Sequence, residues 1–322
     1  MFYKSRAWTL VWLAVIPLLA SLVLLSCSQS QTPLSIGTNI WPGYEPLYLA
    51  REQGLINDNE IHLVEYTSAS QVLNAFRNGI IDAAALTLDE VLTLQSEGLE
   101  PKIVLVLDIS TGGDAILARA DIKDFKQLRG KRVGVENTAL GAYFLSRALQ
   151  LNGMSEQDIS IVPIELHQHL PYFRNQQVDA VVTFDPARAH LLQQGASVLF
   201  DSSMIPNEIV DVLVINSKVY QDHQKQLNTL IDAWYQSIEQ VKARDEESMA
   251  IINRRLQLDP SSLLKAYDGL MLPDRKLNSH LIHGRQPALR STADLLAHTM
   301  QTSKLLTGTV HPASLFTGEN GK

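Results

Sequence analysis

From Leu34 to the region of Asn216, short apolar runs alternate with segments in which apolar residues recur at helical spacing. This rhythm is typical of strands joined by crossover helices, and it predicts an α/β fold with enough strands for two sheets. The predicted strands cover residues 34–40, 60–66, 81–87, 102–108, 114–119, 132–136, 159–164, 179–184 and 210–215. The predicted helices between them cover residues 45–53, 69–78, 88–96, 140–151 and 186–194.

After Asn216 the pattern becomes purely helical, with helices predicted at about 221–243, 246–256, 260–270 and 288–305. Such a tail, following two sets of strands and helices, favours a return of the chain to its first lobe. Residues 308–322 contain Thr, Gly, Pro and Asn without periodicity, so we expect a loosely attached terminus there. His280 and His283 stand among polar residues, and we interpret their segment as a polar loop.

Two segments, 108–117 and 208–214, carry an apolar strand through polar or glycine-rich residues without an intervening helix. We interpret both as hinge crossings between two lobes. Lobe 1 then comprises residues 34–112 plus 211–322, and lobe 2 comprises residues 113–210. Each piece is large enough to build a core of its own.

The first residues of the chain have the pattern of an export signal. Lys4 and Arg6 precede an apolar run over residues 7–25, and the run ends in Ser26-Cys27. Leu24-Leu25-Ser26-Cys27 resembles the bacterial lipobox, which implies a signal peptide over 1–26, cleavage before Cys27 and lipidation of that cysteine. Residues 27–33 then form a polar tether, and the protein is lipid-anchored on the periplasmic side of a bacterial membrane. The alternative is an uncleaved membrane anchor over the same run.

Composition narrows the class of protein. The chain has 322 residues, 45% of them hydrophobic and 19% charged, which is too apolar for a disordered protein. Because 34 Asp and Glu outnumber 27 Lys and Arg, the net charge of −7 argues against nucleic acid as a partner. Cys27 is the only cysteine, so an internal disulfide and a Cys-rich zinc site are excluded.

Four stretches of the chain together resemble one family, the solute-binding proteins of bacterial ABC importers of the nitrate, sulfonate and thiamine-precursor type. They are Thr38 to Ile56, Asn78-Gly79-Ile80-Ile81-Asp82-Ala83-Ala84, Leu128 to Val135 (Leu-Arg-Gly-Lys-Arg-Val-Gly-Val) and Val178 to Pro186 (Val-Asp-Ala-Val-Val-Thr-Phe-Asp-Pro). The resemblance covers about residues 34–260. It implies a two-lobed periplasmic-binding-protein clamshell of type II, with two mixed sheets, flanking helices and a helical C-terminal tail.

The same resemblance implies what the protein does. A small-molecule ligand lies between the lobes, the hinge closes on it, and the closed monomer docks on an ABC permease. A ligand-sensing co-receptor for a membrane signalling protein is an alternative, and an exported enzyme of the same superfamily is a second one. We find no G-x-S-x-G, H-E-x-x-H or phosphate-loop motif, so we expect no catalysis and no cofactor. His167 and His169 lack a nearby third ligand, so we also expect no metal site.

The candidate ligand-binding residues stand at predicted strand ends and crossings, where ligands of open α/β sheets bind. They are Trp41, Tyr44, Thr87, Asp89, Gly113, Asp114, Thr138, Ala139, Tyr143, Phe184, Asp185 and Asp211. The aromatic pair Trp41 and Tyr44 can stack on a ring or hold a cation. Gly113 permits close approach of a ligand. Free N–H groups after Asn137 can bind an anionic group.

Local roles compete with ligand contact at several of these positions. Thr87 and Glu90 have the spacing of a capping box, Thr138 can cap the helix that follows it, and Asp185 before Pro186 can do the same. Asp211 alternates with valines and is either a site residue or a residue that faces solvent.

The charge of the strand ends points to the ligand. Asp89, Asp114, Glu136, Asp185 and Asp211 are acidic, and no Arg or Lys stands at the equivalent places. Since an oxyanion usually needs Arg or several N–H donors, we expect a cationic or heteroaromatic ligand and not nitrate or a simple sulfonate.

Overall fold

The computed structural model describes residues 32–317, and the chain divides into two compact units, 1–33 and 34–322. The second unit carries the fold described below. The predicted signal peptide, Cys27 and the first residues of the tether lie outside the described residues. Within the described part, no helix combines the length and the apolar character needed to cross a membrane.

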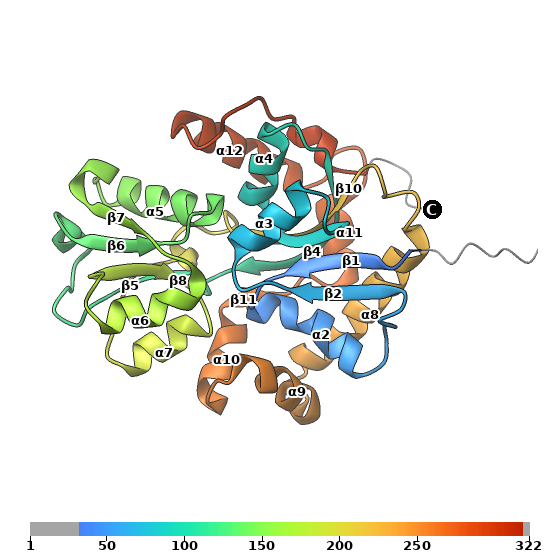
Figure 1. The fold of residues 1–322 in the computed structure, drawn as a ribbon, viewed down its shortest axis with the longest axis horizontal. Helices are drawn as coiled ribbons and strands as arrows, with labels where there is room; N and C mark the ends of the chain where they lie inside the picture. Colours follow the sequence, from blue (N-terminus) through green and yellow to red (C-terminus); the bar gives the residue numbers. More distant parts are fainter. Residues whose placement is uncertain (1–31, 318–322) are drawn as a thin grey trace, which may run out of the picture. The chain divides into compact units, whose positions relative to one another are not determined.

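The first sheet has six strands in the order β11-β4-β10-β3-β1-β2 (Figure 1). Its strands are β1 (Leu34–Thr38), β2 (Ile61–Glu65), β3 (Ala83–Thr87), β4 (Pro101–Ser110), β10 (Val210–Asn216) and β11 (Leu270–Met271). The strands β1, β2 and β3 are parallel, whereas β10 runs antiparallel to its neighbours β3 and β4. All five residues of β3 are buried, as expected for a strand covered on both faces.

The second sheet has five strands in the order β7-β6-β8-β5-β9. They are β5 (Ala115–Ala118), β6 (Arg132–Val135), β7 (Ser160–Pro163), β8 (Ala180–Thr183) and β9 (Ser197–Asp201). This sheet is also mixed, because β6 is parallel to β7 and β8 while β5 is antiparallel to β8 and β9. The chain leaves the first sheet through residues 111–114 and returns through residues 202–209. The predicted fold class of two mixed sheets with flanking helices is therefore confirmed.

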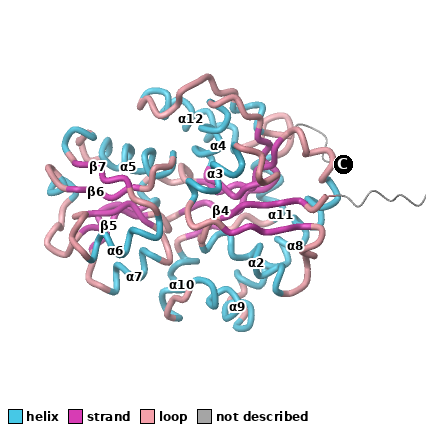
Figure 2. Tube along the Cα trace, viewed as in Figure 1, coloured by secondary structure: helices cyan, strands magenta, loops and turns pink. Residues whose placement is uncertain are grey.

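Helices cover the sheets, as Figure 2 shows in cyan against magenta strands. They are α2 (Glu45–Glu52), α3 (Ala69–Arg77), α4 (Leu88–Ser96), α5 (Ala139–Leu151), α6 (His169–Arg174), α7 (Ala187–Gln193), α8 (Gln224–Lys242), α9 (Glu246–Leu256), α10 (Pro260–Asp268), α11 (Arg275–Ile282) and α12 (Leu289–Thr302). One apolar core joins α3, α4 and α12 to the first sheet, and a second core on its other side joins α2, α8 and α9. Trp234 of α8 is completely buried in the second core.

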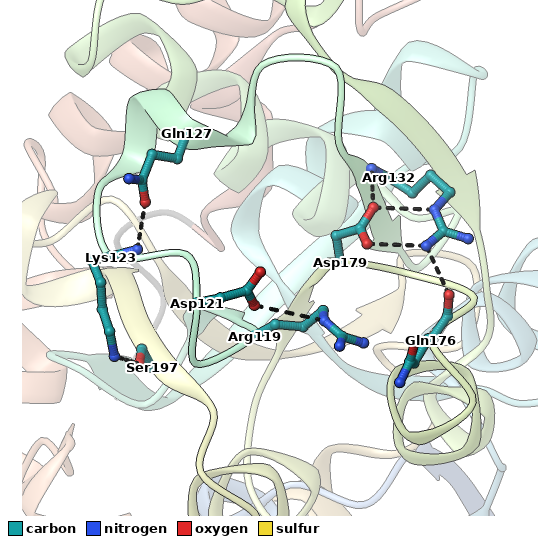
Figure 3. A network of polar contacts seen from close by, with 8 residues as sticks. All are labelled: Arg119, Asp121, Lys123, Gln127, Arg132, Gln176, Asp179 and Ser197. Atoms are coloured by element: carbon teal, nitrogen blue, oxygen red, sulfur yellow. Dashed lines mark hydrogen bonds and ion pairs between the residues drawn. The ribbon is translucent and has the colours of Figure 1, made fainter.

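An aspartate fixes the strand register at the amino ends of each sheet. Asp82 before β3 accepts hydrogen bonds from the backbone N–H (2.9 Å) and hydroxyl (2.6 Å) of Ser35 in β1. Asp179 before β8 takes the same role, because its carboxylate accepts from the backbone N–H of Arg132 (2.9 Å) and pairs with its guanidinium (Figure 3). The carboxyl ends of β1 and β3, and likewise those of β6 and β8, therefore lie side by side. The candidate site lies at these ends.

Some predicted features are wrong. The pattern missed β9, β11, α6 and α11, which are short or interrupted by proline and so show little periodicity. His280 lies in α11 and not in a polar loop. This helix is tied to the sheet by Asn278, whose side-chain amide accepts from the backbone N–H of Val106 (3.0 Å) and donates to its carbonyl (2.6 Å).

The C-terminal segment is also better attached than predicted, up to residue 317. Leu315 is completely buried and Phe316 forms a parallel bridge with Ile103 of β4. The side chain of Gln95 accepts a hydrogen bond from the backbone N–H of His311 at 2.6 Å. Periodicity could not predict this attachment, because the attachment depends on a few apolar residues that contact β4, far away in the sequence.

Candidate functional site

A cavity lies where strands of both sheets end. It is lined by Asn39, Trp41, Tyr44, Ala69, Thr87, Glu90, Asp114, Glu136, Thr138, Leu140, Gly141, His169, Val182, Phe184 and Asp211. Most of these residues lie at the carboxyl ends of β1, β3, β6 and β8 or at the amino ends of nearby helices, as expected for a site in an α/β fold, whereas Asp114 precedes β5 and Asp211 lies in β10. The space inside the cavity that the centre of a water molecule can occupy is about 40 Å³. This is room for a few water molecules.

Two carboxylates lie opposite each other on neighbouring strands, and one of them, Asp211, lines the cavity. Asp211 of β10 pairs in register with Asp108 of β4 on one side and with Thr87 of β3 on the other. Like charges directly opposite each other in a sheet repel, and both aspartates are buried. Burial, followed by the neighbouring carboxylates, raises the pKa of Asp211 well above its usual value. The pKa of Asp108 rises to about 7, mainly through burial.

Two aromatic residues meet these carboxylates. The short 3-10 turn Pro42–Tyr44 follows β1, and the Tyr44 hydroxyl donates to Asp211. The indole N–H of Trp41 donates to Asp108 at 3.0 Å. Trp41 also packs edge-on against Phe184 from the other sheet, with ring centroids 5.3 Å apart and planes at 88°. The aromatic pair therefore bonds to both aspartates, and Trp41 also contacts Phe184, directly after β8 of the second sheet.

Asp114 lies in the first crossing and faces the cavity. Its backbone N–H donates to the Ser110 hydroxyl at 3.2 Å, and its side chain is 4% exposed. Burial raises its pKa to about 6, against the lowering effects of the Ser110 hydrogen bond and of Arg188. Gly113 packs so closely on Trp41 that a Cβ there would lie 2.8 Å from the indole ring. The predicted close approach at Gly113 is thus made to Trp41.

Three helices that begin near the cavity, α4, α5 and α7, have hydrogen bonds from the chain's own side chains at their amino ends. At α4 the Glu90 carboxylate accepts from the backbone N–H of Thr87 at 3.1 Å, in the predicted capping box. At α5 the Thr138 hydroxyl accepts from Gly141 N–H at 3.3 Å, and at α7 Asp185 accepts from Ala189 N–H at 2.9 Å. These amino ends therefore offer a ligand anion fewer free donors than the sequence led us to expect.

The amino end of α3 is capped from the other sheet. Glu136, directly after β6, accepts from the backbone N–H (3.1 Å) and the hydroxyl (3.2 Å) of Ser70. Burial raises its pKa to about 7, against the lowering effect of the Ser70 N–H. Within the described residues, none of the ion pairs involves Glu136.

One histidine lines the cavity. Nδ1 of His169 lies 3.0 Å from the Thr183 hydroxyl, and its Nε2 has no hydrogen-bond partner within the described residues. Burial lowers its pKa to about 4, so the ring is neutral at neutral pH. Hence His169 adds no positive charge to the acidic cavity. Among the described residues, no three His, Cys, Asp or Glu side chains are grouped so that they could hold a metal ion.

The structure brings seven of the twelve predicted residues to the cavity wall: Trp41, Tyr44, Thr87, Asp114, Thr138, Phe184 and Asp211. The other five, Asp89, Gly113, Ala139, Tyr143 and Asp185, are not part of that wall. Asp89 is completely buried behind it, and the Tyr143 hydroxyl donates to Glu208. Asp211 is 3% exposed, so the interpretation of a solvent-facing residue is wrong.

Sequence reasoning missed other residues of the wall. The strand-end rule had already drawn attention to Glu136, and the capping box to Glu90, without placing either at the site. Ala69 and Val182 carry no signal that a single sequence would show, and His169 was considered only as a metal ligand. They reach the cavity because the two sheets face each other there.

Gly43 is essential for this arrangement. A Cβ on Gly43 would lie 1.8 Å from Asp108 Oδ2 and 2.4 Å from Trp41 Nε1, so any side chain must break their hydrogen bond. We expect Gly43→Ala to lower the free energy of unfolding by about 3 kcal/mol, measured by urea denaturation. Trp41→Phe removes the hydrogen bond without the clash and should cost about 1 kcal/mol. Equal urea midpoints for Gly43→Ala and the unaltered protein would contradict this role.

Comparison with known proteins places the chain among relatives. A protein of Brucella abortus strain 2308, named as a candidate binding protein, is 22% identical over 216 residues, or 63% of this chain and 67% of the relative. The periplasmic aliphatic sulphonate binding protein SsuA from Escherichia coli superposes with a TM-score of 0.70 at 21% identity, over 88% of this chain and 97% of SsuA.

A further solved structure is the ligand-binding component of an ABC-type import system from Staphylococcus aureus. It superposes with a TM-score of 0.69 at 14% identity, over 88% of this chain and 98% of that one. These likenesses show that the fold is that of periplasmic binding proteins. The model of the NMT1-like family matches residues 28–254, more than two thirds of the chain. The chain therefore belongs to the NMT1-like family.

Proposed function

We propose that this protein is the solute-binding component of an ABC importer and that its ligand is a small organic cation or a protonated heteroaromatic compound. The observation that carries the proposal is the wall of the cavity, which joins both sheets and contains Glu90, Asp114, Glu136 and Asp211 but no Arg or Lys. Relatives named for ligand binding and ABC import support the transport role.

The carboxylates of the cavity have unused capacity to accept hydrogen bonds. In the wall, Glu90 and Asp114 each have one buried oxygen without a hydrogen-bond partner among the described residues, and Asp89 and Asp108, outside the wall, each have at least one such oxygen. Burying such oxygens costs free energy unless a donor reaches them. A cation with several N–H groups would supply both the charge and the donors, and Trp41 and Phe184 would offer it aromatic faces.

The route of the chain supports binding by hinge closure. We propose lobes of residues 34–112 plus 211–322 and 113–210, since the chain crosses between the sheets only through residues 111–114 and 202–209. A ligand larger than a few water molecules needs these lobes to part, and closing them again would bury it. In this proposal Cys27 carries the lipid anchor on the periplasmic side of the membrane, and a permease receives the ligand.

The proposal is tested by thermal unfolding of the purified full-length protein with amines, amidines, aminopyrimidines, methanesulfonate and nitrate at equal concentrations. A ligand at about 100 times its dissociation constant adds roughly 2.7 kcal/mol and raises Tm by several degrees. We expect such a shift with cations, and we expect Trp41→Ala to reduce it. Recovery of the unchanged compound after incubation would separate binding from an enzymatic role.

Two results would contradict the proposal. A shift produced only by methanesulfonate or nitrate would keep the binding-protein role but overturn the cationic ligand. Chemical change of a bound compound would favour the exported enzyme over the binding protein.

A further inference from the structure

At the amino end of α3, Glu136 takes the role that a capping residue next to the helix normally has. In α3 the residue before the helix is Ser68, whose side chain makes no capping hydrogen bond. Its hydroxyl is buried and has no hydrogen-bond partner among the described residues. The N–H and hydroxyl of Ser70 instead donate to Glu136, which lies 66 residues away, directly after β6 of the five-stranded sheet.

This cap differs from the others around the cavity. Glu90 and Asp185 accept from N–H groups within four residues of themselves, so any helix could carry such caps. Glu136 reaches across the cavity, and both it and Ala69, the first residue of α3, line the wall. Its carboxylate therefore occupies space that belongs to the ligand-binding cavity.

The chemistry of this position is that of an anion site. The amino end of a nine-residue helix offers N–H donors and the positive end of the helix dipole, and Ser70 adds a hydroxyl. A sulfonate, nitrate or carboxylate group of a ligand would find the same donors if Glu136 were absent. With Glu136 present, such a group meets a carboxyl that has already taken the donors and fills the space beside them.

We propose that Glu136 is a specificity-determining residue, which excludes oxyanionic ligands by keeping its own carboxylate on the amino end of α3. This inference deepens the proposed function and rests on it, because it names the residue that separates cationic from anionic ligands. It also explains how a fold shared with a sulphonate-binding protein can present an acidic cavity.

The test is a gain of anion binding in the full-length protein. We expect Glu136→Ala to bind methanesulfonate at least ten times more tightly than the unaltered protein, measured by isothermal titration calorimetry at neutral pH. Glu136→Gln should not gain this binding, because its amide oxygen still accepts from Ser70 and fills the same space. Glu136→Ser offers a second short side chain if the alanine variant folds poorly.

Two controls separate this role from a general loss of negative charge. Glu165 lies close enough to raise the pKa of Glu136 but does not line the cavity, so Glu165→Ala removes a nearby charge and leaves the α3 cap in place. We expect no gain of methanesulfonate binding from it. Ser70→Pro removes the N–H and the hydroxyl together, and Pro46 already stands at the second position of α2. Combined with Glu136→Ala, it should abolish the gained binding.

The outcomes for the inference and for the proposed function are distinct. Methanesulfonate binding by the unaltered protein as tight as that of Glu136→Ala would overturn the inference, and so would an equal gain in Glu165→Ala. Absence of any gain in both short-side-chain variants would overturn it as well. Failure of the unaltered protein to bind any cation, together with a gain in Glu136→Ala, would instead count against the proposed cationic ligand alone.

Discussion

Asp114→Asn is expected to weaken binding of the cationic ligand about a hundredfold and at the same time to stabilise the unliganded protein. Asp114 has the lowest pKa among the cavity carboxyls whose values are resolved, about 6, so it carries negative charge at neutral pH. It is 4% exposed, and one of its oxygens has no hydrogen-bond partner within the described residues. Losing one partner of a buried ion pair typically costs 2–5 kcal/mol, which is the source of the expected loss of affinity.

The gain in stability has the same origin. Without a ligand, the ionised Asp114 side chain is buried and incompletely paired, and asparagine keeps its shape without its charge. We therefore expect the Tm of unliganded Asp114→Asn to exceed that of the unaltered protein by a few degrees at pH 8. Calorimetry with the tightest-binding cation and thermal unfolding without ligand measure the two effects.

Asp179→Asn is the matched control. Asp179 pairs with Arg132 at the far ends of the strands, and the hydrogen bonds from that guanidinium lower its pKa. This change should lower Tm and leave ligand affinity unchanged, the reverse of Asp114→Asn. If Asp114→Asn destabilised the unliganded protein and kept full affinity, Asp114 would be a structural residue and not part of the binding site.

The unliganded protein should lose stability as pH rises from about 4.5 to 7.5. Five buried carboxyls have pKa values raised to about 6 or 7, namely Glu45, Asp89, Asp108, Asp114 and Glu136. Below the unfolded pKa near 4 both states are protonated. Between that value and the folded pKa the unfolded state releases its proton first, so unfolding becomes easier as pH rises. For Glu136 alone, a rise from 4.5 to about 7 corresponds to about 3 kcal/mol.

One group acts in the opposite direction. The pKa of His169 is lowered to about 4, so the unfolded state takes up a proton below pH 6.5 that the folded state refuses, and stability falls as pH drops. A single histidine offsets one carboxyl of the five. Carboxyls with lowered pKa values, such as Asp179, change stability below pH 4 and so lie outside this range.

Thermal unfolding at pH 5, 6, 7 and 8 at constant ionic strength measures the effect. We expect Tm to fall by several degrees from pH 5 to pH 8, and Glu136→Gln to flatten the profile. A saturating cation should reverse the slope, because it stabilises the ionised carboxyls. A Tm that rose steadily toward pH 8 without ligand would show that these carboxyls are ionised at little cost, and the acidic cavity would need another explanation.

The sequence by itself was sufficient for the class of fold and for part of the site. The predicted strand at 81–87 contains the observed β3, and the predicted helix at 88–96 has the bounds of α4. Such long or strongly patterned elements are determined locally, by apolar spacing and by caps such as Thr87 with Glu90. Trp41, Asp114 and Phe184 were found because ligands of α/β sheets gather at strand ends.

The sequence did not reveal how strands pair within each sheet or how the second sheet meets the helices of the first. Asp108 was predicted as the end of a strand and the start of a crossing, yet the register of β10 against β4 places it opposite Asp211. Glu136 was one of several acidic residues, and its contact with Ser70 depends on how the second sheet meets α3. Apolar spacing determines each element because neighbours along the chain suffice, whereas register and long-range contacts depend on residues far apart in sequence. The tertiary structure alone therefore decided which acidic residues face the cavity and which one caps the opposite helix.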